Sequence, residues 1–401
     1  MFLSRRSFVK AASVSGLGAL TVPLIAARGS EALRDGIFEI EPVGASGTAR
    51  FASDERAAFR IALPDAIRLD SNENPNGPGQ TALEAIRAMF GEASRYPDVP
   101  TDDLKQAIAR HRKVAPENVL IGCGSGEILR MAVYAFTSPQ RALVTGAPSF
   151  EDPVKHADIT HAPVRAVPVD GQLRLDLGRM LDETPNAGLV FLCNPNNPTA
   201  TVHGASAVRD FITQTNKRAP DCVVMVDEAY HEYVDDPSYA TSIPLALDNP
   251  KVITVRTFSK VFGMAGLRLG YAIGRPETLR EMQRHKLPNN VNVLAAASAI
   301  ATLPDAAHIE RERQLNREAR EFTRKALEGM GYKSGASDTN FIMVAIGRDS
   351  KAFKEACAKH GILVGRAFPP LTTQARISIG TMDEMKRAVD VFRQVLSGAA
   401  N

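Results

Sequence analysis

Short apolar runs alternate with helix-forming segments between residues 119 and 273, and this pattern constrains the fold more than any other feature of the sequence. Near-continuous apolar runs bounded by turn residues are typical of buried strands. Strands are predicted at residues 119–121, 141–145, 189–193, 223–226 and 252–255, followed by one at 269–273 that could run antiparallel. Apolar strands that alternate with helices indicate an α/β fold with a mostly parallel sheet, covered on both faces.

The pattern changes after about residue 285, where short strands and helices follow one another. A long charged helix is predicted at 304–329, and further helices at 351–359 and 383–396. Strands are predicted at 340–346, 362–364 and 375–379. We expect a smaller α+β domain over residues 286–401, completed by residues 33–75, beside a large domain over residues 76–285.

Composition limits the kinds of partner. The 401 residues are 44% hydrophobic and 23% charged, which is ordinary for a globular protein, and they are enough for two closely joined domains. A net charge of +3 is too small to indicate a nucleic-acid partner. Outside the N-terminus, no apolar run approaches the roughly 20 residues of a membrane span.

The N-terminus has the features of an export signal. The paired arginines Arg5 and Arg6, with Phe8 and Lys10, match the twin-arginine signal, and a mildly apolar segment follows over residues 11–27. We therefore expect residues 1–32 to be removed and the mature chain to be periplasmic, after passage through the twin-arginine export machinery. The alternative is an amphipathic surface helix.

The four cysteines are Cys123, Cys193, Cys222 and Cys357. Their spacing is not that of a metal site, so no metal is expected. A periplasmic chain could form disulfides, but Cys193 and Cys222 flank or begin apolar runs. Buried free thiols are therefore the favoured interpretation.

Polar residues follow the predicted strands, where ligands bind outside the carboxyl ends of a parallel sheet. Gly124-Ser125-Gly126 opens a helix, whose backbone N–H groups can hold a phosphate. Asp227 ends an apolar run, and a buried acid there is costly unless it is paired. Lys260 follows the run at 252–255, and a nearby cation can lower its pKa and free its amine to form a Schiff base.

The segment around Lys260 resembles the cofactor-lysine segment of pyridoxal-phosphate (PLP) enzymes of aminotransferase type. The matching residues are Thr-Phe-Ser-Lys, ending at Lys260, and Gly-Met-Ala-Gly-Leu-Arg-Leu-Gly-Tyr, ending at Tyr271. The closest resemblance is to the histidinol-phosphate aminotransferase family. It implies the type I, aspartate-aminotransferase-like PLP-dependent transferase fold, with PLP as the cofactor.

The resemblance also implies roles around the cofactor ring. Lys260 would hold PLP and act as the general base and acid, and Asp227 would keep the pyridine nitrogen cationic. Phe150 would stack on the ring. Asn197 and Tyr230 would hydrogen-bond the ring oxygen.

The phosphate and the substrate have matching residues as well. The residues that would bind the phosphate are Gly124, Ser125, Gly126, Ser259 and Arg268, with Tyr96 reaching over from the second subunit of a homodimer. Arg376 would grip the α-carboxylate of the substrate through two parallel hydrogen bonds. Asn340 and Asn74, the latter in the turn-rich loop at 69–78, would also line the substrate site.

Two positions depart from the pattern of the family. Ala200 stands where the family has glycine, which tolerates positive φ better than alanine does. Gly365 stands where the family tends to have an arginine, and Arg366 follows it. The second departure bears on whether the substrate carries a phosphate.

The resemblance as a whole implies an aminotransferase that moves an amino group between an amino acid and a 2-oxo acid. Two alternatives remain open on the sequence. One is another PLP-dependent reaction on an amino acid, carried out by a lyase, decarboxylase, racemase or oxidase. The other is a binding protein that shares the fold without catalysis.

Overall fold

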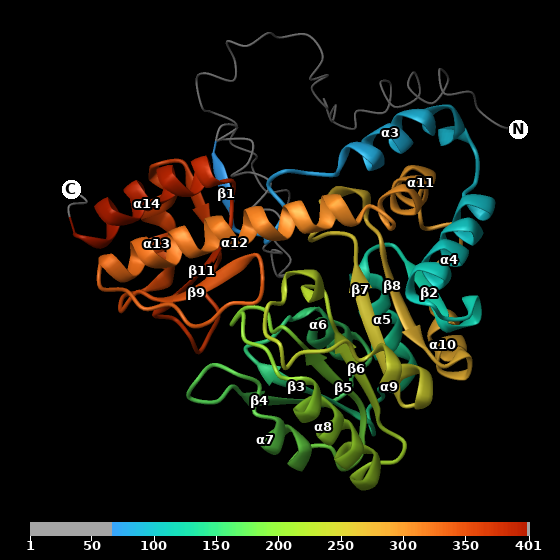
Figure 1. Cartoon of the computed structure of the whole chain (residues 1–401). Coiled ribbons are helices and arrows are strands. Elements are labelled where there is room, and N and C mark those ends of the chain that lie inside the picture. The colour runs from blue at the N-terminus through green and yellow to red at the C-terminus, as the bar shows by residue number, and fades with distance from the viewer. Residues whose placement is uncertain (1–65, 399–401) are drawn as a thin grey trace, which may run out of the picture. The chain divides into compact units, whose positions relative to one another are not determined.

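A seven-stranded sheet forms the centre of the computed structural model, which describes residues 66–398 (Figure 1). Strand β8 runs antiparallel to both of its neighbours, and the other neighbouring strands are parallel. The predicted α/β fold with a mostly parallel sheet is thereby confirmed. In spatial order the strands are β2 (Val119–Gly122), β8 (Gly270–Gly274), β7 (Val252–Thr257), β6 (Val223–Asp227), β5 (Ala187–Cys193), β3 (Ala142–Ala147) and β4 (Val164–Pro168).

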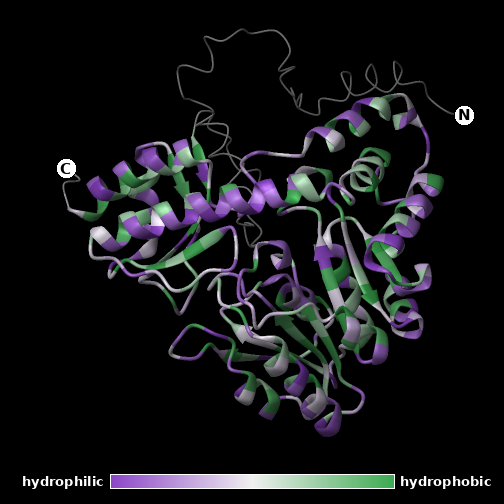
Figure 2. Cartoon of the chain, in the orientation of Figure 1, coloured by the Kyte–Doolittle hydropathy of each residue, from purple (hydrophilic) through white to green (hydrophobic). Residues whose placement is uncertain are grey.

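Helices cover both faces of this sheet because successive side chains of a strand point to opposite sides. Phe191 and Met225 belong to the core on the side of α5 (Ser125–Phe136), α6 (Asp152–Ile159) and α10 (Pro276–Gln283). Their neighbours Val190 and Val224 belong to the core on the other side. The helices of that second side are α7 (Leu177–Asp182), α8 (Ala205–Arg218) and α9 (Ile243–Asp248). Burial on both faces explains the continuous apolar runs, and Figure 2 shows the hydrophobic strands.

The sequence prediction missed two strands, β4 and the three-residue β1 (Ile67–Leu69). Strand β4 lies at the edge of the sheet, where most of its residues are at least partly exposed and give no apolar run. Helix α4 spans Asp98–Arg112. Pro100 lies in its first turn, where an N–H group has no partner within the helix and a proline is tolerated.

Two small sheets lie outside the central one, and the first of them joins the chain before residue 70 to the chain after residue 340. Strand β1 (Ile67–Leu69) pairs in parallel with β10 (Ile362–Val364), and β11 (Gln374–Ser378) pairs antiparallel with β9 (Phe341–Ala345). Helices α12 (Ala306–Gly329), α13 (Ser350–Lys359) and α14 (Met382–Leu396) contribute apolar residues to the same core. The predicted strands and helices here are found within a few residues. The domain boundaries stay predictions.

The remaining elements lie around α11 (Val293–Thr302), which packs against α3 (Gln80–Ala88) and α4. The short 3-10 helices are η1 (Phe90–Ser94), η2 (Pro116–Asn118), η3 (His231–Tyr233) and η4 (Ala265–Leu267). Within residues 66–398, no helix combines the length and apolar character needed to cross a membrane, and no cluster of three or more His, Cys, Asp or Glu side chains is placed to bind a metal. All four cysteines are free.

Candidate active site

Lys260 follows strand β7, and its amine points at the loop after β1. Its Nζ donates a hydrogen bond of 2.9 Å to the carbonyl oxygen of Asn72, and a longer one of 3.4 Å to that of Ser71. Burial, and next the positive charge of Arg376, lower the pKa of Lys260 to about 8. The amine is therefore far more available as a nucleophile near neutral pH than that of a solvated lysine.

Asp227 ends strand β6, next to the strand that leads to Lys260. Its carboxyl group is buried, and Oδ1 has no hydrogen-bond partner among residues 66–398. Burial raises the pKa of Asp227 to about 7, although the backbone N–H of Ala229 and the charge of Lys260 act in the opposite direction. A cationic N–H donor would satisfy Oδ1 and stabilise the carboxylate. The protonated pyridine nitrogen of PLP is such a group.

Glycines form a narrow cradle where α5 meets Arg268. Gly124 has a φ of 77°, and a Cβ at this position would lie 2.4 Å from Nη2 of Arg268. A Cβ at Gly270 would lie 2.4 Å from the backbone nitrogen of Ser125. The missing side chains let a guanidinium lie beside the first turn of a helix, where an anion such as phosphate is stabilised. Gly126 lies in the same turn, and Ser259 directly precedes Lys260.

Arg376 and Asn197 meet across the site. Arg376 is buried on β11 and donates from Nη1 to Oδ1 of Asn197 over 2.6 Å and from Nη2 to the carbonyl oxygen of Asp70 over 2.6 Å. Because Oδ1 of Asn197 accepts this bond, its Nδ2 is the atom that can donate to a ring oxygen. The structure thus places two predicted site residues in contact, although they lie far apart in the sequence.

The loop at 69–78 reaches the site through Asn72, which the sequence prediction did not single out. Nδ2 of Asn72 donates to the hydroxyl of Tyr230 over 3.1 Å, and its carbonyl oxygen accepts from Lys260 and, over 3.0 Å, from Nδ2 of Asn340. Asn74 instead donates to the carbonyl oxygen of Val261 and to Glu312. The loop contains three asparagines, so composition could not indicate which one faces Lys260.

Ala200 adopts the left-handed conformation that the family's glycine suggests, with a φ of 64°. Its N–H donates to the carbonyl oxygen of Asn196 over 2.8 Å, and its own carbonyl oxygen accepts from Asp338. Such a conformation costs an alanine about 1–2 kcal/mol. The turn that carries Asn197 is therefore kept despite the substitution.

Phe150 and Tyr96 have different surroundings. Phe150 follows β3, is half-buried and packs against the apolar core beside α5. Tyr96 precedes α4, and 79% of its surface is exposed. An aromatic side chain with this exposure is available to a second molecule.

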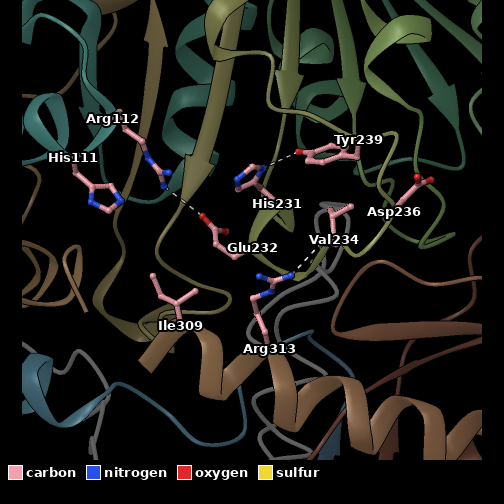
Figure 3. Close-up of a pocket in the computed structure, with 9 residues that line it drawn as sticks. All are labelled: His111, Arg112, His231, Glu232, Val234, Asp236, Tyr239, Ile309 and Arg313. Carbon is pink, nitrogen blue, oxygen red and sulfur yellow. Dashed lines mark hydrogen bonds and ion pairs between the residues drawn. The ribbon is translucent and has the colours of Figure 1, made fainter. Parts of the chain in front are cut away.

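A buried ion network lies next to Asp227. Arg256, on β7, donates from Nε to Glu228 over 2.8 Å and from Nη1 to Glu232 over 3.1 Å. Glu232 continues to Arg112 at the rim of a cleft of about 280 Å³ (Figure 3). None of the predicted site residues lines this cleft, so we distinguish it from the site around Lys260. The sequence did not indicate this network, because its members come from separate elements: Arg256 is on β7, Glu232 on η3 and Arg112 at the end of α4.

Known proteins match almost the whole described chain. The family described as aminotransferase class I and II matches residues 64–392. The histidinol-phosphate aminotransferase of Moorella thermoacetica is 35% identical over 347 residues, which covers 86% of this chain and 89% of that protein. The one of Symbiobacterium thermophilum is 35% identical over 338 residues, covering 84% and 92%.

Solved structures agree in fold. A putative histidinol-phosphate aminotransferase from Erwinia carotovora atroseptica has a TM-score of 0.81 and 31% identity, covering 84% of this chain and 98% of that one. The histidinol-phosphate aminotransferase of Sinorhizobium meliloti, in complex with pyridoxal-5'-phosphate, has a TM-score of 0.79 and 28% identity, covering 88% and 100%.

Proposed function

This chain belongs to the aminotransferase class I and II family and is a PLP-dependent aminotransferase, and we propose that Lys260 carries its cofactor and moves the proton during catalysis. The observation that carries the proposal is the buried Oδ1 of Asp227, which has no hydrogen-bond partner within residues 66–398 and lies beside the strand that leads to Lys260. A carboxylate for the ring nitrogen and a low-pKa amine are the two groups that PLP chemistry needs from its protein.

When bound, PLP supplies a ring that withdraws electrons from the α-carbon of the substrate. Asp227 keeps the ring nitrogen protonated, and Asn197 and Tyr230 donate hydrogen bonds to the ring oxygen. Arg376 holds the substrate α-carboxylate and so orients the α-hydrogen. Lys260 Nζ would move a proton between the substrate α-carbon and the C4′ position of the bound cofactor.

The test is the variant Lys260→Ala, incubated with PLP, an amino acid and a 2-oxo acid. We expect no sustained turnover and no cofactor mass retained on the protein after borohydride reduction. Lys251→Ala is a matched control, because Lys251 precedes the other end of the same strand. Continued turnover by Lys260→Ala, or loss of turnover in Lys251→Ala, would contradict the assignment.

The substrates proposed here are an amino acid and a 2-oxo acid. The relatives named above are histidinol-phosphate aminotransferases, which gives one candidate donor. A screen of amines, followed through the cofactor spectrum without a 2-oxo acid, identifies the donor. A strict need for a 2-oxo acid during turnover separates transamination from decarboxylation, elimination and racemisation.

A homodimer is the proposed assembly, with Tyr96 reaching the phosphate in the partner's site. Phe90, Tyr96 and Val99 expose 60%, 79% and 69% of their surfaces within a short stretch, as expected of an interface. A mixture of the Tyr96→Ala and Lys260→Ala proteins tests this, because a mixed dimer contains one site with both native residues. Recovery of activity on mixing supports the proposal, and additive residual activities oppose it.

Export by the twin-arginine route is proposed from Arg5 and Arg6, which lie outside the described residues. The variant Arg5→Lys with Arg6→Lys keeps the charge but changes the paired arginines. We expect the protein to remain in the cytoplasm, whereas an Arg34→Lys control is exported. Equal periplasmic amounts of both proteins would refute this route.

A further inference from the structure

We propose that the ion pair between Glu151 and Arg366 makes this enzyme select amino acids with an uncharged side chain over phosphorylated ones; this rests on the proposed function of the site around Lys260. Glu151 is the residue that repels the phosphate. The proposal concerns the part of the substrate that lies beyond the α-carboxylate.

A series of side-chain contacts connects Arg376, the proposed α-carboxylate site, to this ion pair. The ring of Phe368 contacts two guanidinium groups, and its centre lies 4.8 Å from that of Arg376 and 4.3 Å from that of Arg366. Nη2 of Arg366 forms an ion pair with Oε2 of Glu151 at 2.5 Å. In this proposal, a substrate whose α-carboxylate binds Arg376 extends its side chain along Phe368, toward the pair of Glu151 and Arg366.

The two partners of the ion pair come from different segments of the chain. Glu151 directly follows Phe150, the predicted ring-stacking residue, and precedes α6. Arg366 comes from the segment after β10. Both side chains stay partly accessible, with 46% and 32% of their surfaces exposed, so a bound substrate can reach them.

The charges of the pair oppose a phosphate. A free arginine at this place would bind a phosphate through two hydrogen bonds. Here Nη2 of Arg366 already donates to a carboxylate, and Nη1 donates to the carbonyl oxygen of Ala367 over 2.7 Å. A dianionic group would have to displace Glu151 or lie beside its negative charge. Such a repulsive element discriminates between ligands that are otherwise alike.

The neighbouring position cannot supply a replacement arginine. A Cβ at Gly365 would lie 2.7 Å from the carbonyl oxygen of Arg376 and 3.3 Å from its Nε. The N–H of Gly365 also donates to that carbonyl oxygen over 2.9 Å. A larger residue at position 365 would therefore displace Arg376, so Arg366 is the cation that meets the substrate side chain.

The test compares homoserine with O-phosphohomoserine, which differ only by the phosphate, in the holoenzyme and in Glu151→Gln. We expect the parent enzyme to prefer homoserine in kcat/KM. Glu151→Gln should shift the ratio toward the phosphorylated donor at least about tenfold, equivalent to about 1.4 kcal/mol, with kcat/KM for homoserine changed less than about threefold. Glu151→Asp, which keeps the charge, should retain most of the discrimination.

Two outcomes overturn the inference. One is a parent enzyme that prefers the phosphorylated donor, and the other is an unchanged ratio in Glu151→Gln while both proteins turn over homoserine. Failure of the proposed function is distinguishable, because it removes turnover with every amino acid in the parent enzyme as well. In that event the inference falls with the function on which it rests.

Discussion

Arg376 donates a hydrogen bond from Nη1 to Oδ1 of Asn197 over 2.6 Å, and this contact joins strand β11 to the loop after β5. It connects the residue proposed for the substrate carboxylate to one proposed for the cofactor oxygen. The bond orients the amide of Asn197 so that Nδ2 is its free donor. Binding of a carboxylate to Arg376 would therefore act directly on the hydrogen bond that Asn197 donates to the cofactor oxygen.

Replacing Asp227 by Asn should stabilise the cofactor-free protein at pH 8 and nearly abolish its transaminase activity. Burial raises the pKa of Asp227 from 3.8 to about 7, so the folded protein binds more protons than the unfolded chain between these values. The stability from this group is complete below about pH 4 and is lost as the pH rises through 7. The uncharged amide avoids that loss, on the order of a few kcal/mol.

Urea unfolding at pH 5 and pH 8 checks the effect of Asp227→Asn. We expect the difference in unfolding free energy between variant and parent to grow with pH. Asp221→Asn is the control, because the side chain of Asp221 is exposed. A difference that is the same at both pH values would contradict the buried-acid explanation.

The attachment of PLP to the cofactor-free protein should accelerate with pH, with a midpoint near 8. The pKa of Lys260 falls from 10.5 to about 8, so between these values its amine is neutral in the folded protein and charged in the unfolded chain. Below pH 8 the folded protein buries a charged amine, which lowers its free energy of unfolding. This free energy rises again as the pH increases from 8 toward 10.5, because the amine in the folded protein is then neutral. Borohydride trapping followed by mass measurement gives the rate at each pH.

Arg376→Gln should move that midpoint upward, because Arg376 is the largest contributor to the lowered pKa of Lys260 after burial. Arg348→Gln is a suitable comparison, since Arg348 donates its hydrogen bonds to the C-terminal end of α14 and to Tyr332. A midpoint at the same pH in Arg376→Gln and the parent protein would show that Arg376 does not act on the amine.

Arg256→Met should destabilise the protein by about 3–5 kcal/mol, because it leaves Glu228 buried without its cation. The double variant Arg256→Met with Glu228→Gln should recover part of that loss, since no unpaired charge remains. Urea unfolding of the single and double variants measures both effects. A double variant less stable than Arg256→Met would mean that burial of the charge is not the cause.

Ala200→Gly should change stability by less than about 1 kcal/mol. Glycine removes the backbone strain of the left-handed alanine, which adds about 1–2 kcal/mol to the free energy of unfolding. Loss of the buried methyl group costs about 0.8 kcal/mol, and the freer unfolded chain costs roughly 0.5–1 kcal/mol. Ala132→Gly, at a buried helical position in α5, has no such relief and should lose about 2 kcal/mol. Equal losses in the two variants, measured by thermal unfolding, would argue against strain at position 200.

Asn72→Ala should lower kcat/KM roughly 5- to 150-fold, because the hydroxyl of Tyr230 loses a hydrogen-bond donor worth about 1–3 kcal/mol. Asn74→Ala should lower it less, since Asn74 contacts Val261 and Glu312. Steady-state kinetics with the same donor and acceptor compare the two variants. A larger loss in Asn74→Ala would instead favour a direct role of Asn74 at the substrate.

Local patterns predicted the sheet and the chemistry at its edge. Apolar runs indicated strands β2, β3, β5, β6, β7 and β8, and the carboxyl ends of parallel strands lie at one edge, so Asn197, Asp227 and Lys260 could be grouped in advance. Strand β4 was not predicted, because an edge strand need not be apolar on both faces. The antiparallel direction of β8 was left open, since it depends on pairing rather than periodicity.

The sequence by itself determined the α/β sheet and the residue types at its strand ends, because burial on two faces demands continuous apolar runs and PLP chemistry demands a lysine and an acid. Only the tertiary structure decided which asparagine faces Lys260, that Arg256 pairs with Glu228, and that Glu151 meets Arg366. Each of these contacts joins residues that are distant in the chain or lie on different strands. Their geometry depends on how the elements pack, which local propensity does not encode.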